Sequence, residues 1–328
     1  MDRRRLGRRG PVVSAIGLGC MGMSDFYGPA DEAESIATIH AALEAGIDLI
    51  DTGDFYGMGA NEMLIAKALK GRRDKAIISV KFGAQRGPDG SWLGYDARPQ
   101  AVKTALAYTL KRLGTDYIDI YRPARLDPNV PIEETAAAIA ELIKAGYVRQ
   151  MGLSEVSAET VRRAHAVTPI SDLQIEYSLI TRMIEKTILP GLRALGVGVT
   201  AYGVLSRGLI SAATVAGHTA ERPFFPRFTG DNLKKNSELV RVLDNIAKGH
   251  GISVAQLAIA WALSRGDDIV PVIGARSRVR LKETLGALEV RLGGLEHEAI
   301  DKAVAAYGVA GTRYAAPQMA MLDSENNR

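Results

Sequence analysis

Two acids and a tyrosine follow a short apolar run in the stretch IDLIDTGDFYG, residues 47–57. Asp51 and Tyr56 lie in this stretch, and Lys81 ends the next apolar run along the chain. A phenol, whose pKa is ordinarily about 10, donates a proton poorly at neutral pH unless a neighbouring cation favours its ionised form. Lys81 could supply that cation and Asp51 could hold its ammonium group, so the three side chains could act together as a general acid. Asp54 is interpreted as a hydrogen-bond acceptor that stabilises the loop.

Secondary structure must position these residues, and short apolar runs alternate with helical patterns along the whole chain. Strands are expected at 15–19, 47–51, 76–81, 117–121, 148–154, 172–177, 197–202 and 269–274. Helices are expected at 32–45, 61–69, 99–114, 132–145, 157–166, 183–195, 236–250 and 254–264, followed by a final helical pair. The helix at 99–114 has proline in its first turn and glycine at its end, which is typical of helix boundaries.

The strand runs are so apolar that they must be buried on both faces, which indicates parallel strands covered by helices. Eight strand–helix units in 328 residues predict an α/β protein, a parallel eight-stranded (β/α)8 barrel in a single domain over 1–328. An N-terminal β-hairpin is expected ahead of the first barrel strand. The site of such a barrel lies at the carboxyl ends of the strands, where Asp51 and Tyr56 are found.

Two long connections follow the third and seventh strands, at 82–97 and 203–234. Both are rich in glycine, proline and aromatic residues, which is typical of loops that cover a substrate at the mouth of a barrel. Trp92 in the first of them could line an apolar substrate pocket with Met21 and Met23, although core or loop packing is an equal alternative for each. Cys20, beside Met21, is interpreted as a buried structural thiol.

Composition and charge limit the class of partner. Hydrophobic residues make up 47% of the chain and charged residues 24%, and the formal net charge of +4 is too small and too dispersed to indicate nucleic acid. A single cysteine excludes an internal disulfide and the multi-cysteine zinc patterns, so no metal is expected and a reducing cytoplasm fits best. The basic N-terminus precedes no apolar segment long enough for a signal peptide or membrane span. The oligomeric state is not indicated.

Eight motifs are spread in one order over nearly the whole chain. They are LGRRGPVVSAIGLGCMGMS (6–24), DTGDFYGMGANEMLIAKAL (51–69), ISVKFG (78–83), LKRLGTDYIDIY (110–121), VRQMGLSE (148–155), LQIEYS (173–178), AYGVLSRGLI (201–210) and PVIGARS (271–277). In these motifs the chain resembles the aldo-keto reductase family, in particular its perakine reductase and pyridoxal reductase-like branch.

The resemblance implies hydride transfer from NADPH to an aldehyde or ketone, with Tyr56 as proton donor assisted by Lys81 and Asp51. Taken singly, a tyrosine beside a loop is usually a surface residue, and a lysine near an aspartate usually forms a structural ion pair. Their joint occurrence at strand ends, inside the matching motifs, favours the catalytic interpretation.

One position departs from the family pattern. After the fourth strand the family usually carries a histidine that positions and polarises the carbonyl, in a context resembling YxxHRxDP. The sequence here is YRPARLDP, residues 121–128, so Ala124 takes the place of that histidine in the substrate pocket. Removing one donor to a developing oxyanion can cost about 10²–10³ in rate, so Ala124 does not by itself abolish activity. Three readings stay open, namely a carbonyl reductase, a reductase for a less usual substrate such as pyridoxal, and an NADPH-binding sensor with vestigial activity.

Other side chains could stand in for the missing histidine. Arg122 and Arg125 flank Ala124, and either could place a guanidinium near the carbonyl, although the strand pleat points them away from the Ala124 side chain. His218, in the long connection after the seventh strand, is the one histidine that could reach the site. It is interpreted as an exposed loop residue.

The resemblance also implies contacts to the nicotinamide end of the cofactor. Ser154 and Gln174 match positions that hydrogen-bond the carboxamide, and Tyr202 matches the aromatic residue that stacks on the ring. Met21 and Gly22, after the first strand, lie against the same end. The tail segment RYAAPQM, residues 313–319, is expected from related chains to close over the cofactor.

Two further stretches are expected to hold the phosphate groups of the cofactor. The loop 203–208 offers Gly203, Leu205, Ser206, Arg207 and Gly208 to the pyrophosphate. The stretch 274–283 contributes Gly274, Arg276, Ser277, Arg280 and Glu283, and its arginines and serine could bind an adenosine 2′-phosphate at a helix start. A solvated basic helix start is the alternative. Two arginines favour NADPH over NADH, while Thr284 stands where the family often has an asparagine that contacts adenine.

Overall fold

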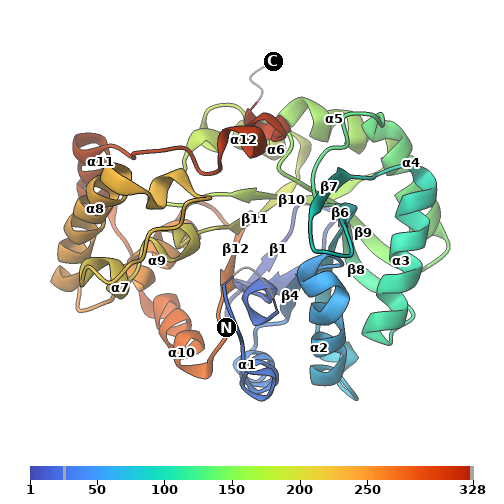
Figure 1. The fold of residues 1–328 in the computed structure, drawn as a ribbon, viewed down its shortest axis with the longest axis horizontal. Helices are drawn as coiled ribbons and strands as arrows, with labels where there is room; N and C mark the ends of the chain where they lie inside the picture. Colours follow the sequence, from blue (N-terminus) through green and yellow to red (C-terminus); the bar gives the residue numbers. More distant parts are fainter. Residues whose placement is uncertain (25–26, 326–328) are drawn as a thin grey trace.

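Eight parallel strands close into a barrel at the centre of the molecule (Figure 1). The computed structural model describes residues 1–24 and 27–325. The barrel strands are β3 (Gly17–Gly19), β4 (Leu49–Gly53), β5 (Ile77–Phe82), β8 (Ile118–Pro123), β9 (Val148–Ser154), β10 (Ile170–Glu176), β11 (Gly198–Tyr202) and β12 (Ile269–Gly274). They follow one another round the barrel in this order, and β12 pairs back to β3. The predicted (β/α)8 barrel is confirmed.

Helices surround the barrel (Figure 1). They are α1 (Glu32–Glu44), α2 (Ala60–Ala68), α3 (Pro99–Leu113), α4 (Ile132–Lys144), α5 (Ala158–Val167), α6 (Ile188–Leu195), α7 (Ala212–Val215), α8 (Gly230–Gly249), α9 (Val254–Ser264), α10 (Arg278–Gly286), α11 (Gly294–Tyr307) and α12 (Ala316–Ala320). Proline at the first position of α3 and Gly114 at its end, with φ of 64°, fit the expected boundaries. Among the described residues no helix is long and apolar enough to cross a membrane.

Short 3-10 turns follow several strands and helices. They are η1 (Met21–Met23), η2 (Tyr56–Gly59), η3 (Arg73–Lys75), η4 (Met183–Glu185), η5 (Ser206–Gly208), η6 (Pro226–Phe228), η7 (Ala287–Glu289) and η8 (Asp323–Glu325). Three of them, η1, η2 and η5, come directly after barrel strands or the loops that continue them. They therefore carry side chains to the mouth of the barrel.

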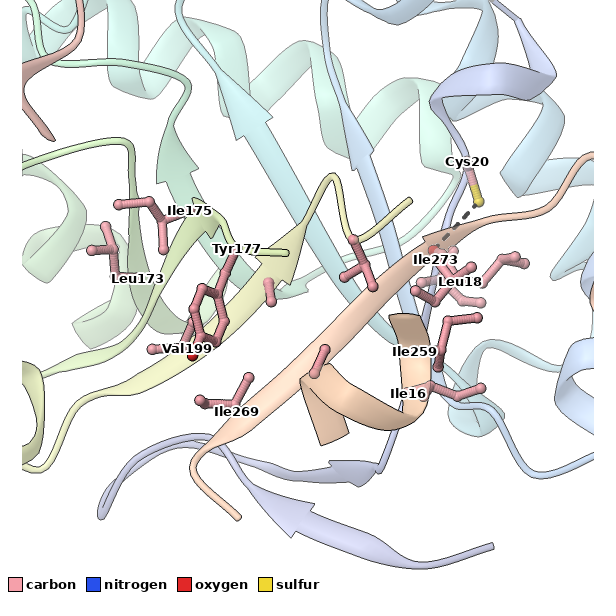
Figure 2. Packing of buried hydrophobic residues seen from close by; sticks show 14 of the residues in the cluster. Ile16, Leu18, Cys20, Leu173, Ile175, Tyr177, Val199, Ile259, Ile269 and Ile273 are labelled. Atoms are coloured by element: carbon pink, nitrogen blue, oxygen red, sulfur yellow. Dashed lines mark hydrogen bonds between the residues drawn. The ribbon is translucent and has the colours of Figure 1, made fainter. Parts of the chain in front are cut away.

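Alternate residues of each barrel strand face opposite sides, as the strand pleat requires. On β10, Leu173 and Ile175 pack in the hydrophobic layer between the barrel and the helices, which also contains Ile259 of α9 (Figure 2). Asp172 and Gln174 point the other way and bond to polar side chains inside the barrel. The interior of the barrel is thus polar at the level where the site is built.

The predicted N-terminal hairpin is formed by β1 (Arg3–Arg5) and β2 (Val12–Ser14), which pair antiparallel. A second apolar cluster joins Leu6 and Val13 of this segment to side chains from the barrel strands. Its members are Leu6, Val13, Leu49, Ile120, Val270 and Val272. Because Leu49 and Val270 lie near the amino ends of their strands, the hairpin closes that end of the barrel and leaves the carboxyl ends for the site.

Both long connections contain secondary structure that was not expected. Within 82–97 the chain forms an antiparallel hairpin of β6 (Ala84–Arg86) and β7 (Trp92–Tyr95). Within 203–234 it forms α7 and η6, and α8 begins at Gly230 instead of 236 with Asp231 in its first turn, where an acid is favourable. The helix expected over 183–195 is divided into η4 and α6, and Pro190 lies in the first turn of α6, where its missing N–H costs little.

A glycine motif that starts in the first barrel strand has the spacing of a dinucleotide-binding turn but does not form one. The segment GLGCMG, residues 17–22, has the GxGxxG spacing of a dinucleotide-binding turn. In the structure it forms β3 and η1 of a closed barrel, where an open doubly wound sheet would have its first turn. A motif of this kind therefore needs its structural context before it indicates a cofactor site.

Candidate active site

Asp51, Tyr56 and Lys81 meet at the carboxyl ends of two neighbouring strands. Asp51 lies on β4 and Lys81 on β5, and the parallel register places Gly53 beside Lys81. Lys81 Nζ donates to Asp51 Oδ1 at 2.5 Å and lies 5.2 Å from the centre of the Tyr56 ring, which η2 carries. All three side chains are buried. The structure thus brings together the three residues that the sequence singled out.

Asp51 is held in one orientation by further donors. Ser79 Oγ donates to Asp51 Oδ2 at 2.9 Å, and Gln174 Nε2 donates to the same oxygen at 2.7 Å. Below them Arg122 Nη2 donates to Ser79 Oγ at 3.1 Å, and Arg122 forms a fully buried ion pair with Asp172 at 2.8 Å. This network inside the barrel fixes the carboxylate that in turn holds Lys81.

Burial changes the proton affinity of the two groups above Asp51. It lowers the pKa of Lys81, and the charge of Asp51 raises that pKa in part. It raises the pKa of Tyr56 well above its usual value, Asp51 adds to the rise, and the charge of Arg125 opposes it. Tyr56 is therefore protonated at neutral pH, which is the state that a general acid must have before it reacts.

The two arginines beside Ala124 have different environments. Ala124 is buried, and Arg122 points into the barrel, where its guanidinium is bound to Asp172. The expectation that Arg122 could reach the carbonyl is wrong, because strand alternation places its side chain inside the barrel below the site. Arg125 follows the strand end and reaches Ser154 Oγ, at 3.4 Å from Nη1. His218 is exposed after α7, as the sequence indicated.

The residues expected at the nicotinamide end lie side by side on neighbouring strands. Gln174 on β10 pairs in register with Ser154 on β9, and Tyr202 ends β11, which pairs with the other side of β10. Met21 and Gly22 form η1 directly after β3. The hydroxyl and amide donors of this group thus converge at one end of the barrel, although the amide of Gln174 is bound to Asp51 in this structure.

Sequence reasoning missed a buried acid beside this group. Glu155 has the left-handed φ of 54°, which is rare for a residue with a side chain and marks a constrained position. Both carboxylate oxygens of Glu155 accept from Arg313 of the tail, at 2.7 and 2.6 Å, and Tyr202 Oη donates to Oε1 at 2.7 Å. Burial raises the pKa of Glu155, but the charge and hydrogen bonds of Arg313, the charge of Arg125 and the bond from Tyr202 together hold that pKa well below its usual range.

The tail is fastened to the mouth of the barrel at several points. Tyr314 Oη lies 2.9 Å from Tyr202 Oη, and Ser324 Oγ donates to Glu155 Oε2 at 2.7 Å. Asp323 Oδ2 accepts from the backbone N–H of Ser157, at the start of α5, at 2.8 Å. The signal for this contact was present in the motif VRQMGLSE and in the tail segment RYAAPQM, but their pairing could not be deduced from spacing.

The loop expected at the pyrophosphate is a tight turn with left-handed backbone. The expected residues in it are Gly203, Leu205, Ser206, Arg207 and Gly208. Ser206 and Arg207 have φ of 47° and 56°, an unusual conformation that is concentrated at functional sites. Arg207 Nη2 lies 3.1 Å from Glu176 Oε2, and its guanidinium lies 4.3 Å from the centre of the Tyr314 ring. In this structure a carboxylate therefore already neutralises the cation of the loop.

The stretch after β12 forms a cationic helix start. Gly274 ends β12 and is exposed, and Ser277 is the N-cap of α10, where its hydroxyl accepts from the N–H of Arg280 at 3.4 Å. Arg276 and Arg280 are exposed, and Arg280 pairs with Glu283 at 3.0 Å. Exposed cations and free N–H groups at a helix start are the groups that a phosphate binds.

Two residues of α10 near this helix start already bond to other protein groups. Arg278 donates from its side chain to Glu34 Oε1 and Oε2 and from its backbone N–H to Oε1, so its charge is already paired with this residue of α1. Thr284 is buried, and its hydroxyl donates to the backbone carbonyl of Arg280 at 3.0 Å. The hydroxyl therefore does not replace the adenine contact of an asparagine.

The donors at the barrel mouth and those after β12 are of the kinds that bind a nicotinamide nucleotide. Ser154 and Gln174 lie on neighbouring strands at the end of the barrel where Gln174 bonds to Asp51. The exposed guanidinium groups of Arg276 and Arg280 lie after β12. Among residues 1–24 and 27–325 no cluster of histidine, cysteine or acidic side chains could hold a metal ion.

Aromatic residues form one wall at the mouth of the barrel. Phe55 contacts the Tyr56 ring edge-to-face at 4.8 Å and the Trp92 ring at 6.3 Å. Trp92 lies on β7 with 41% of its surface exposed, so it is a rim residue and does not pack in the core. Burial, with a smaller effect from the charge of Glu62, raises the pKa of Asp54 to about 7, and its Oδ1 is buried without a hydrogen-bond partner among the described residues.

Comparisons with known proteins agree on one family. The model of the aldo/keto reductase family matches residues 15–305. A protein of Glycine max named probable aldo-keto reductase 1 is 42% identical over 317 residues, which cover 94% of this chain and 91% of the relative.

Solved structures of the same kind superpose on nearly the whole chain. The glycerol dehydrogenase of Gluconobacter oxydans has a TM-score of 0.84 at 27% identity, covering 95% of this chain and 97% of the other. An aldo-keto reductase of Bacillus halodurans in its holo form has a TM-score of 0.78 at 30% identity, covering 92% of this chain and 96% of the other. A thermostable aldo-keto reductase in complex with the inhibitor epalrestat has a TM-score of 0.74 at 30% identity, covering 92% of this chain and 100% of the other.

Proposed function

The chain belongs to the aldo/keto reductase family, and on that premise we propose that it uses NADPH to reduce an aldehyde or ketone to an alcohol. Tyr56 is the proton donor in this proposal, assisted by Lys81 and Asp51. One observation carries it: the Lys81 ammonium lies between the Asp51 carboxylate, at 2.5 Å, and the Tyr56 ring, at 5.2 Å from the ring centre.

The cofactor would be held from the barrel mouth to the start of α10. Ser154 and Gln174 would bind the nicotinamide carboxamide, Tyr202 would stack on the ring, and Met21 and Gly22 would contact the same end. Gln174 would share its amide with Asp51, to which it donates at 2.7 Å. When bound, NADPH supplies the hydride that reduces the carbonyl carbon.

The phosphate groups would be bound by the turn after β11 and by the stretch after β12. The turn of Gly203, Leu205, Ser206 and Gly208 would offer N–H groups to the pyrophosphate, and Arg207 would reach it once its ion pair with Glu176 opens. Gly274, Arg276, Ser277, Arg280 and Glu283 would surround the adenosine end. Arg276 and Arg280 support a preference for NADPH, because two exposed guanidinium groups suit a 2′-phosphate.

The protein groups supply the proton and its placement. As negative charge builds on the carbonyl oxygen, the O–H bond of Tyr56 breaks and its proton passes to that oxygen. Lys81 stabilises the tyrosinate that forms, and Asp51 keeps the ammonium charged and in place. General acid catalysis of this kind is worth about 10²–10⁴-fold in rate.

Consumption of NADPH by the purified protein tests the proposal. We would follow NADPH absorbance with a panel of aldehydes, ketones and pyridoxal, beside Tyr56→Phe as the matched control. Saturable turnover that is lost in the Tyr56→Phe variant supports the reductase. NADPH binding without turnover of any panel member contradicts it.

Ala124 favours a second candidate function. With no donor at the usual histidine position, the protein could be an NADPH-binding sensor or regulatory protein with vestigial activity. The hydrogen bond from Lys81 to Asp51, with Lys81 also close to the Tyr56 ring, supports the enzyme more strongly. The same assay separates the two, because a sensor binds NADPH and turns over nothing.

The substrate is proposed to be a small carbonyl compound. Phe55 and Trp92, whose rings are in contact, and the methyl group of Ala124 would give a substrate pocket an apolar character, which suits the body of an aldehyde or ketone. The single free thiol, Cys20, is buried and agrees with a cytoplasmic location, which stays a prediction together with a single domain over 1–328.

A further inference from the structure

We propose that Arg125 contacts the substrate's carbonyl oxygen and supplies the positive charge that the family's usual histidine would supply and Ala124 cannot. The proposal rests on the carbonyl reduction proposed above and adds one catalytic residue to it. As the new C–H bond forms at the carbonyl carbon, an electron pair moves onto the oxygen. The guanidinium stabilises this charge until the Tyr56 proton neutralises it.

The position of Arg125 is fixed from three segments of the chain. It follows Ala124 directly after the end of β8, and Nη1 donates to the carbonyl of Ala124 at 2.6 Å. Nη1 also donates to Ser154 Oγ at 3.4 Å, and Nη2 donates to Tyr314 Oη at 3.3 Å. The guanidinium therefore lies across the barrel mouth between β8, β9 and the tail, beside the residue that replaces the histidine.

The charge of Arg125 helps to lower the pKa of Glu155, but its guanidinium makes no direct contact with an acidic side chain among the described residues. Its three hydrogen-bond partners are neutral, and in the part of the chain that the structure describes it forms no ion pair. Of its five N–H donors, Nε–H and one N–H of Nη2 have no acceptor among the described residues. A half-buried cation of this kind suits a site where negative charge develops. Arg122, by contrast, forms an ion pair with Asp172.

The electrostatic effect of Arg125 reaches the reacting groups. Burial is the main cause of the high pKa of Tyr56, followed by Asp51, and Arg125 acts in the opposite direction by favouring the tyrosinate. Arg125 also adds to the lowering of the Lys81 pKa, after burial and against Asp51. Arg125 therefore lies within electrostatic range of both reacting groups.

A double-variant experiment separates a catalytic role from a structural one. We would measure kcat for the unmodified protein, Arg125→Met, Ala124→His, and both changes together. If Arg125 does the work of the missing histidine, Arg125→Met lowers kcat by about 10²-fold in the Ala124 background. In the Ala124→His background, Arg125→Met lowers kcat only a few-fold, because the histidine supplies another donor. Equal losses in the two backgrounds overturn the proposal, since Arg125 would then act only by holding Ser154 and Tyr314.

Two controls sharpen this test. Tyr314→Phe removes the hydroxyl that accepts from Arg125 but keeps the charge, and is expected to change kcat only a few-fold. Arg125→Lys keeps the charge without the fork of donors and is expected to recover part of the loss. Binding of NADP⁺, followed by quenching of protein fluorescence, is expected to be the same in Arg125→Met and the unmodified protein.

Failure of the underlying function gives a different result. Turnover by the unmodified protein with equal losses in both backgrounds contradicts the role of Arg125 alone. Turnover that appears only after Ala124→His contradicts both the role of Arg125 and the proposal that the native chain is a reductase.

Discussion

Arg313 donates from its two terminal nitrogens to the two carboxylate oxygens of Glu155, at 2.7 and 2.6 Å. The pair is almost completely buried and joins the tail to the loop that follows β9. Glu155 also accepts from Tyr202, so a segment near the end of the chain positions a side chain of the candidate site. Stability and the geometry of the site are therefore coupled through this contact.

Arg313→Met is expected to lower the free energy of unfolding by about 3–5 kcal/mol, because it leaves the Glu155 carboxylate buried without its cation. Unfolding in urea, followed by circular dichroism, measures the change. The double variant Glu155→Gln with Arg313→Met removes both charges and is expected to recover part of the loss. An Arg313→Met protein as stable as the parent would show that the buried pair contributes nothing.

Acid is expected to weaken the protein through Glu155. Its folded pKa is held below the usual value, so the stability it contributes is complete above its unfolded pKa, about 4.3. That contribution is lost as the pH falls from there towards the lower folded pKa. Urea midpoints at pH 7 and at about pH 3 should therefore differ more for the parent than for the double variant. Equal slopes with pH would contradict the assignment.

Arg276 and Arg280 are expected to set the preference for NADPH. Replacing either with methionine should raise the KM for NADPH by about 10-fold, because a charge-assisted hydrogen bond to phosphate is lost. The KM for NADH, which has no 2′-phosphate, should stay within a few-fold. Arg278→Met is the matched control, since Arg278 is exposed on the same helix start but is bound to Glu34. A similar loss in all three variants would indicate only a general effect of surface charge.

Lys81→Met is expected to lower kcat by about 10²–10⁴-fold, since the ammonium that stabilises the tyrosinate is removed. NADP⁺ binding should be retained, which fluorescence quenching can show. The variant also leaves Asp51 buried without its cation, so its folded state must be checked by circular dichroism. A folded Lys81→Met protein with undiminished kcat would remove Lys81 from the mechanism.

Much of the fold could be predicted from the sequence because the strands are continuous apolar runs and the helices have clear ends. The barrel, the N-terminal hairpin and the meeting of Asp51, Tyr56 and Lys81 follow from that pattern. The hairpin of β6 and β7 was missed, because its strands are only three and four residues long and lie partly exposed.

Contacts between distant segments were harder to predict. The pairing of Glu155 with Arg313 joins residues far apart in the chain, and no periodic pattern records such a contact. Arg122 and Arg125 looked equivalent in the sequence YRPARLDP. They differ because β8 ends between them, at Pro123. Arg122 is still in the strand and points into the barrel, while Arg125 is free of the pleat and reaches the mouth.

Transfer of deuteride from cofactor to product tests the central claim most directly. The protein would be incubated with NADPH that carries deuterium at the reactive nicotinamide carbon, together with the best substrate of the carbonyl panel. The account predicts an alcohol with one deuterium on its carbinol carbon for each NADP⁺ formed, and no such alcohol with Tyr56→Phe. Bound NADPH that yields no deuterated alcohol with any member of the panel would contradict the account.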